Sequence, residues 1–138
     1  MLAIIGGTGI YKIDGLDVID ELTVETPFGD PSAPIVVAKY LNKELLFLPR
    51  HGTQHQLLPH EINYRANIFA LKKLGAKQVL GFSATGSLRE DIHPGEFAIP
   101  VQYFDFIKGN REKTFFGEGV AAHISTAEPT CPDLTQWV

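Results

Sequence analysis

The residues best suited to chemistry follow a short apolar run near position 50. Arg50 and His51 come directly after residues 45–49 (Leu-Leu-Phe-Leu-Pro), and Gly52 follows them. Arginine offers a rigid fork of donors that suits phosphate or carboxylate, and histidine can add one more donor. Glycine lets the backbone approach a ligand closely or take a positive φ. The stretch predicts an oxyanion site; taken alone, an arginine paired with a surface carboxylate is the more common explanation.

Two small-residue turns after other apolar runs strengthen the oxyanion interpretation. Residues 6–9 (Gly-Gly-Thr-Gly) follow the first apolar run, and residues 83–87 (Ser-Ala-Thr-Gly-Ser) follow a later one. The free backbone N–H groups of such turns can bind an anion. The first turn fits no dinucleotide fingerprint, because Lys12 stands where the third glycine belongs, and no Gly-Lys-Ser/Thr of a Walker loop follows. This disfavours dinucleotide-dependent redox chemistry, and a simple tight turn is the alternative for each stretch by itself.

The predicted strands place these turns at strand ends. We expect strands over residues 2–5, 35–40, 44–48 and 78–82, a short strand within the loops of residues 15–34, and a hairpin turn at residues 41–43. Proline cannot donate to a sheet ladder, so Pro49 should stop the strand before Arg50.

A helix is predicted between the last two strands. Pro59 suits its first turn, and Gly75 suits its end. Its apolar stripe comprises Ile62, Ala66, Phe69, Ala70 and Leu74. A strand–helix–strand crossover brings the ends of both strands to one edge of the sheet, where ligands of α/β proteins bind. Arg50 and Ser83 should therefore lie close enough to hold one ligand.

Composition limits the classes of protein that this chain can represent. Its 138 residues, 44% apolar and 20% charged, fit one ordinary globular domain. The net charge of −4 argues against a nucleic-acid or anionic-membrane partner. The single cysteine, Cys131, cannot form an internal disulfide, which favours a reducing cytoplasm. The first apolar run is too short for a signal peptide or a membrane span.

A metal site is not expected. His51 and His55 have the spacing of metal ligands on a helix, but Gly52 and Pro59 favour a loop there, and no carboxylate stands at a matching offset. His60 begins a sequence similar to a metalloprotease motif whose last histidine is absent. His60 is therefore expected to be polar lining or surface.

Several separated motifs together resemble the methylthioadenosine phosphorylase branch of the purine nucleoside phosphorylases. They occupy residues 4–9, 26–29, 50–52, 63–67, 84–88, 94–95 and 127–129. The resemblance implies a three-layer α/β/α fold with a mixed, barrel-like central sheet, and a homotrimer. It implies phosphorolysis of S-methyl-5'-thioadenosine, or of S-methyl-5'-thioinosine, to the purine and 5-methylthioribose 1-phosphate. Inorganic phosphate is then a co-substrate, and no cofactor is expected.

The resemblance also assigns site residues. Around phosphate it places Thr8, Arg50, His51, Ser83 and Ala84. Of these, Arg50 and His51 would be catalytic. Next to the nucleoside it places Thr85, Gly86 and His123, the last reaching a neighbouring subunit's site. For His123 the alternative is an interface or surface histidine without a ligand contact.

The chain departs from this family in one respect. The resemblance implies a second half of similar length that supplies purine recognition and the acid for the leaving group, whereas this sequence ends two turns into a helix predicted from Pro132. We expect a truncated fold in which residues 1–138 form a single domain, the N-terminal, phosphate-binding half. Alone it should be inactive. The alternative is a non-catalytic fragment that binds phosphate or a nucleotide.

Overall fold

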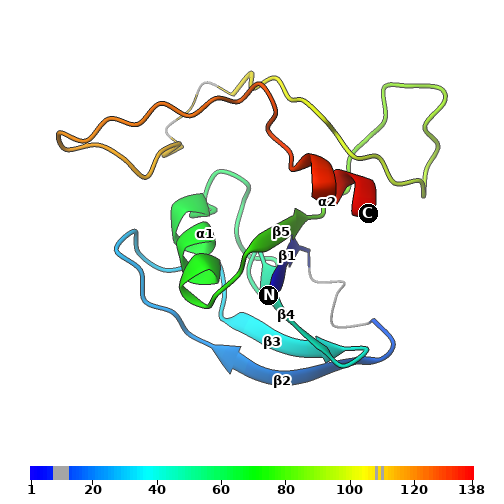
Figure 1. Ribbon diagram of the computed structural model, residues 1–138, viewed down its shortest axis with the longest axis horizontal. Helices are drawn as coiled ribbons and strands as arrows, with labels where there is room; N and C mark the ends of the chain where they lie inside the picture. The colour runs from blue at the N-terminus through cyan, green and yellow to red at the C-terminus, as the bar shows by residue number, and fades with distance from the viewer. Residues whose placement is uncertain (8–12, 108, 110) are drawn as a thin grey trace. The chain divides into compact units, whose positions relative to one another are not determined.

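The computed structural model describes residues 1–7, 13–107, 109 and 111–138 (Figure 1). The chain forms two compact units. The first consists of Met1–Ala84 and Arg111–Lys113, and the second of Thr85–Asn110 and Thr114–Val138. That residues 1–138 form a single domain stays a prediction.

The first unit is built on a mixed five-stranded sheet. Its strands are β1 (Leu2–Gly6), β2 (Leu16–Leu22), β3 (Ile35–Tyr40), β4 (Lys43–Pro49) and β5 (Gln78–Gly81). They lie in the order β2-β3-β4-β1-β5. β1 runs parallel to both β4 and β5, while β2, β3 and β4 form an antiparallel meander. With helix α1 (Tyr64–Lys73), this confirms the α/β class and the mixed sheet.

The hairpin between β3 and β4 is tighter than the sequence predicted. Leu41 and Asn42 both have positive φ, 45° and 64°. Two such residues form the type I′ turn whose twist matches that of paired strands. Lys43 therefore pairs with Tyr40 as the first residue of β4, instead of belonging to the turn.

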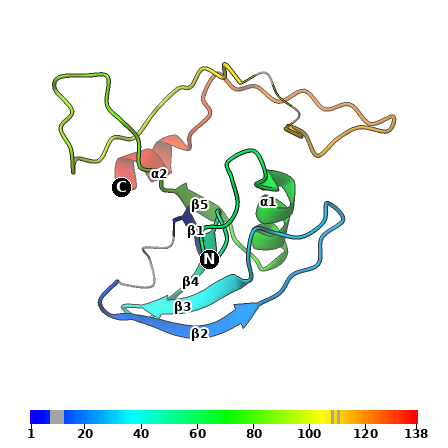
Figure 2. The same cartoon turned by 180° about the vertical axis from the view of Figure 1, so that it is seen from behind.

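Alternate residues of the sheet pack on opposite faces, as the strand period of two requires. Leu46 and Leu48 join Ala3 in one buried cluster, which also contains Ala70 and Leu71 of α1. On the opposite face Phe47 packs with Val36 and Ala38. Figures 1 and 2 show α1 beside the sheet from both sides. Residues 2–6 of β1 and residues 45–49 of β4 therefore include no charged or polar side chain, because this part of the sheet packs on two faces.

Helix α1 begins later than Pro59 suggested. Its N-cap is Asn63, whose side-chain oxygen accepts a hydrogen bond from the Ala66 N–H at 3.1 Å. Asparagine at this position satisfies one of the unpaired amides of the first turn, whereas Pro59 lies in the loop before it. The prediction of Pro59 in the first turn was wrong. The helix ends as predicted, with Gly75 at φ +89°.

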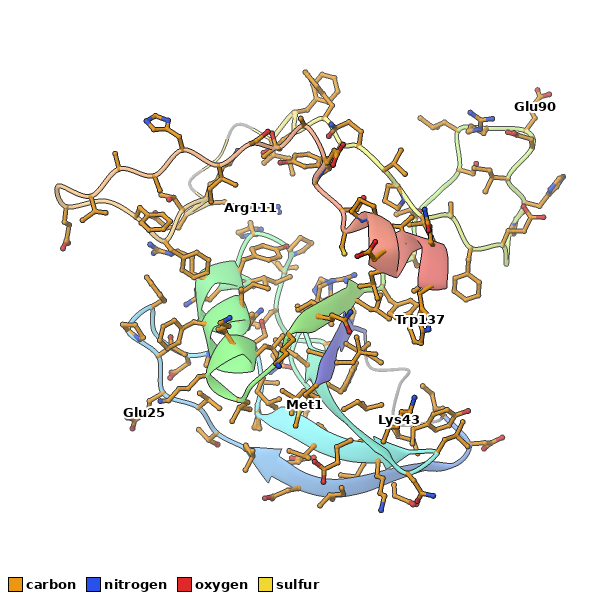
Figure 3. All side chains as sticks on the ribbon, viewed as in Figure 1. Met1, Glu25, Lys43, Glu90, Arg111 and Trp137 are labelled. Atoms are coloured by element: carbon orange, nitrogen blue, oxygen red, sulfur yellow. The ribbon has the colours of Figure 1, made fainter. Side chains whose placement is uncertain are left out.

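The second unit contains helix α2 (Pro132–Trp137), which starts at the predicted proline. The described residues of the second unit form no β-strand. Many of its large apolar side chains are exposed, among them Phe97, Phe104, Phe106, Ile124 and Trp137. Trp137 is labelled in Figure 3. Across the described parts of both units, no helix is long and apolar enough to cross a membrane.

Candidate functional site

The ends of three parallel strands meet where Arg50 leaves the sheet. The Arg50 N–H donates to the Gly6 carbonyl at 3.0 Å, which extends the pairing of β4 with β1. The Phe82 N–H donates to the Ile5 carbonyl at 2.8 Å, which extends the pairing of β5 with β1. The carboxyl ends of β1, β4 and β5 therefore share one edge, and the predicted juxtaposition of these ends is confirmed.

The half-buried Arg50 side chain is held by two partners on different segments. Its Nη1 donates to the Phe82 carbonyl beyond β5, and its Nε donates to Nε2 of His51 at 3.2 Å. A planar guanidinium held at two of its nitrogens has little freedom to rotate. The side chain that carries the charge is thus fixed against the end of β5.

His51 is held in turn by the loop that follows it. Its Nδ1 lies 2.9 Å from the Leu57 carbonyl. Its ring stacks on that of His55, with ring centroids 4.6 Å apart. The two histidine rings of this loop therefore form a stacked pair.

Residues 49–57, the arginine loop, fold back on themselves through backbone hydrogen bonds. The Gly52 N–H donates to Pro49 at 3.0 Å, and the Leu57 N–H donates to His51 at 2.9 Å. Gly52 has φ +82°, and a Cβ there would lie 2.4–2.5 Å from the amide of Gln56. Only glycine meets both conditions without strain.

Residues 63–67, which the sequence marked only through the family resemblance, brace the segment before β3. The Asn63 Nδ2 donates to the Phe28 carbonyl at 2.7 Å. The buried Asn67 accepts from the Ser32 N–H at 2.7 Å and donates to the Ser32 hydroxyl at 2.9 Å. The Arg65 guanidinium lies 5.1 Å from the centroid of the Phe28 ring. These contacts tie α1 to the loop after β2.

The predicted site residues fall in different parts of the structure. Arg50 and His51 are in contact, and Ser83 and Ala84 follow Phe82 in the first unit, exposed. Thr8 lies outside the described residues. The other three predicted site residues lie in the second unit, where they are exposed: Thr85, Gly86 and His123. The assignment of all eight residues to phosphate or nucleoside stays a prediction.

Sequence reasoning missed the two carbonyls that position the charged side chains. The Phe82 carbonyl accepts from Arg50, and the Leu57 carbonyl faces His51. Every residue carries a carbonyl, so no residue type could have indicated these contacts.

This geometry places a charged side chain at the carboxyl edge of an α/β sheet, and comparison with known proteins identifies the class of protein. The model of the phosphorylase superfamily matches residues 1–138. The chain belongs to this superfamily.

Within the superfamily, the chain is similar to phosphorylases of one particular name. The chain is 48% identical over 135 residues to S-methyl-5'-thioadenosine phosphorylase of Geobacter sulfurreducens, covering 98% of this chain and 47% of the relative. It is 50% identical to the enzyme of that name from Hyperthermus butylicus, covering 98% of this chain and 49% of the relative. The chain thus spans about half the length of these relatives.

Solved structures agree with this likeness. A methylthioadenosine phosphorylase from an Antarctic soil metagenomic library superimposes with a TM-score of 0.92 at 44% identity, over 98% of this chain and 47% of that one. Methylthioadenosine phosphorylase from Schistosoma mansoni in complex with adenine gives 0.88 at 38% identity, over 98% and 50%. The nucleoside phosphorylase fold predicted from the sequence is confirmed.

Proposed function

We propose that this chain forms the phosphate-binding part of an enzyme that phosphorolyses S-methyl-5'-thioadenosine or S-methyl-5'-thioinosine. One observation carries the proposal: Arg50 is anchored by Phe82 and His51 at the edge where three strand ends meet. A fixed cation at the carboxyl edge of a sheet is suited to a dianion. The identity of the nucleoside is inferred from the relatives, which are named S-methyl-5'-thioadenosine phosphorylase.

The proposed chemistry needs phosphate to be held beneath the anomeric carbon while the glycosidic bond breaks. Arg50 would orient the dianion, together with Thr8, Ser83 and Ala84. Because Arg50 is already fixed, little reorganisation accompanies the developing positive charge on the ribose. Such positioning contributes up to about 7–11 kcal/mol in the best intramolecular reactions.

The remaining residues are assigned to the nucleoside. Thr85 and Gly86 would border it, and His123 would reach the 5′ group in a neighbouring subunit's site. This requires a homo-oligomer, for which we propose a trimer. We further propose a cytoplasmic role in purine salvage, with phosphate as co-substrate and no cofactor, metal, nucleic acid or membrane partner.

Phosphate binding to the 138-residue protein tests the site. Calorimetry should detect phosphate in the wild type, and Arg50→Ala should lose it because a charged, fork-shaped donor is removed. Lys43→Ala is the matched control: it removes one positive charge at the opposite, hairpin end of the same strand, labelled in Figure 3. Equal phosphate affinity in Arg50→Ala and Lys43→Ala would refute the site.

Release of free purine distinguishes the proposed enzyme from a protein that only binds phosphate or a nucleotide. A form of this protein that has the full length of the relatives should release adenine or hypoxanthine only when phosphate is added. A protein that binds phosphate or a nucleotide tightly at any length, and never releases a purine, would be the non-catalytic binding protein instead.

A further inference from the structure

We propose that Arg50 is a positioning residue as well as the cation of the proposed site. Its side chain fixes the peptide group at which the chain leaves β5, and so it places Ser83 and Ala84. This role rests on the proposed function and deepens it, because it gives the arginine a task that a positive charge alone cannot perform.

Arg50 connects three strands at one edge of the sheet. β1 lies between β4 and β5 in the strand order. Directly after β4, the Arg50 N–H donates to the Gly6 carbonyl, at the end of β1, at 3.0 Å. The Arg50 Nη1 reaches past β1 and donates to the carbonyl of Phe82, the residue that follows β5. Backbone and side chain of one residue thus tie β4 both to β1 and to the exit of β5.

The Phe82 carbonyl is the first acceptor of the chain after the pairing of β5 ends. The register of β5 with β1 stops at Gly81, opposite Ile5. The Phe82 N–H still donates to the Ile5 carbonyl at 2.8 Å. Because β1 ends at Gly6, the donor for the Phe82 carbonyl comes from a side chain, that of Arg50.

The planar peptide bond carries this constraint forward to Ser83. The Phe82 carbonyl and the Ser83 N–H belong to one rigid peptide group, so holding the carbonyl fixes the plane from which Ser83 begins. Within the described residues, Ser83 and Ala84 are exposed and neither makes a hydrogen bond of its own. Their direction is therefore set by the last group that is held before them, the Phe82 carbonyl.

A guanidinium is suited to this double task. Its N–H donors share one rigid plane, so a donor that holds a carbonyl also fixes the direction of the others. A lysine ammonium in the same place would supply a single point of charge. With Arg50 tied to Phe82, the cation and residues 83–84 keep a fixed spacing before any anion binds. Such preorganisation avoids rearrangement when the anion arrives.

Amide hydrogen exchange of the 138-residue protein tests the tie. Arg50→Ala removes a hydrogen bond from a charged group, so the Phe82 N–H should exchange about tenfold to a hundredfold faster. The Lys77 N–H, which donates to Met1 at the other end of β5 at 3.0 Å, is the internal reference and should keep its rate. The control Lys43→Ala should change neither rate. An unchanged rate at Phe82, or an equal rise at Phe82 and Lys77 as general destabilisation produces, would overturn the inference.

Nuclear magnetic resonance of the wild type does not depend on how a variant folds. A tied Arg50 should show slow rotation about its Cζ–Nη1 bond, and a freely rotating guanidinium would overturn the inference. The Ser83 amide nitrogen, which shares its peptide group with the held carbonyl, should shift in Arg50→Ala and keep its position in Lys43→Ala. A Ser83 signal that moves equally in both variants would assign the change to lost charge and overturn the inference.

Chemical rescue separates the planar fork from the charge. In Arg50→Ala, added guanidinium ion supplies both, whereas methylammonium ion supplies the charge alone. Guanidinium, at concentrations well below those that unfold proteins, should restore slow exchange at Phe82 together with phosphate binding, and methylammonium should restore neither. If both ions restored phosphate binding equally, charge alone would suffice and the positioning role would be refuted.

The same experiments distinguish this role from the proposed function. If wild-type protein does not bind phosphate, the phosphate site is refuted, and exchange at Phe82 with rotation of Arg50 still decides whether the tie exists. If wild type binds phosphate and Arg50→Ala does not, the site stands. An unchanged Phe82 exchange rate in that variant would then leave Arg50 as a charge only and overturn the inference.

Discussion

Replacing Gly52 with alanine tests how tightly the arginine loop is built. Gly52 has φ +82°, and an added Cβ would lie 2.4–2.5 Å from the amide atoms of Gln56. The substitution therefore imposes two separate penalties, one from the backbone conformation and one from the contact with Gln56.

Each penalty has an expected size. An L-residue in the left-handed region costs about 1–2 kcal/mol. The Gln56 amide must also move away, which breaks its hydrogen bond from the Gln54 N–H at 3.0 Å and costs about 0.5–1.5 kcal/mol, towards the lower end because the bond is exposed. We expect Gly52→Ala to lower the free energy of unfolding by about 1.5–3 kcal/mol.

Gly75→Ala is the matched control for the backbone penalty. Gly75 has φ +89°, and among the described residues no atom lies within 4 Å of an added Cβ. Urea denaturation of both variants should therefore show a loss of about 1–2 kcal/mol in Gly75→Ala and a larger loss in Gly52→Ala. Phosphate affinity should fall only in Gly52→Ala, because only that loop carries Arg50 and His51.

A third variant isolates the contact. Gly52→Ala combined with Gln56→Ala removes the amide that the new methyl group would meet, so its unfolding free energy should exceed the value that additivity of the single substitutions gives. If Gly52→Ala loses no more stability than Gly75→Ala, and the double variant shows no coupling, the described packing of Gln56 on Gly52 is wrong.

Three further predictions concern the rest of the chain. Asn67→Ala should lower the unfolding free energy by about 1–3 kcal/mol, because it leaves the buried Ser32 N–H without its acceptor, and an unchanged denaturation midpoint would contradict this. The 138-residue protein should self-associate through its exposed apolar side chains, Trp137 included, unless sedimentation finds a folded monomer at micromolar concentration. Without the leaving-group acid that the family resemblance places elsewhere, this protein should show no appreciable phosphorolysis; phosphate-dependent release of purine at about one per second would refute that.

The location of the candidate site followed from the sequence because strand ends are marked by residue type. Pro49 and the small residues after Phe82 identify where two strands stop, and parallel strands stop at a common edge. The start of α1 could not be predicted correctly from the sequence. Proline is common in the first turn of a helix, so Pro59 competed as a starting residue with the true N-cap, Asn63. Local preference is a weak guide when two good starting residues lie four positions apart.

The orientation of Arg50 was beyond sequence reasoning for a different reason. It depends on the Phe82 carbonyl, 32 positions away, and on a ring nitrogen of His51. Neither contact has a compositional signal. Both contacts depend on the pairing of β1 with β4 and with β5, because this pairing brings the ends of those strands to one edge.

The position of β1 in the sheet has a consequence for the order of folding. β1 is the first strand of the chain, yet it lies between β4 and β5 and pairs with both. The meander of β2, β3 and β4 can form from neighbouring segments, whereas β1 must close long loops, which is slow because chain entropy is lost before the contacts form.

The edge that carries Arg50 therefore comes into existence only when this non-local pairing is complete. An anion that binds there recognises the finished sheet and not the meander, so phosphate should slow the opening of the whole first unit and not of a single loop. Without β1, β5 would have no neighbouring strand in the described sheet and the Arg50 N–H would lose its acceptor on Gly6.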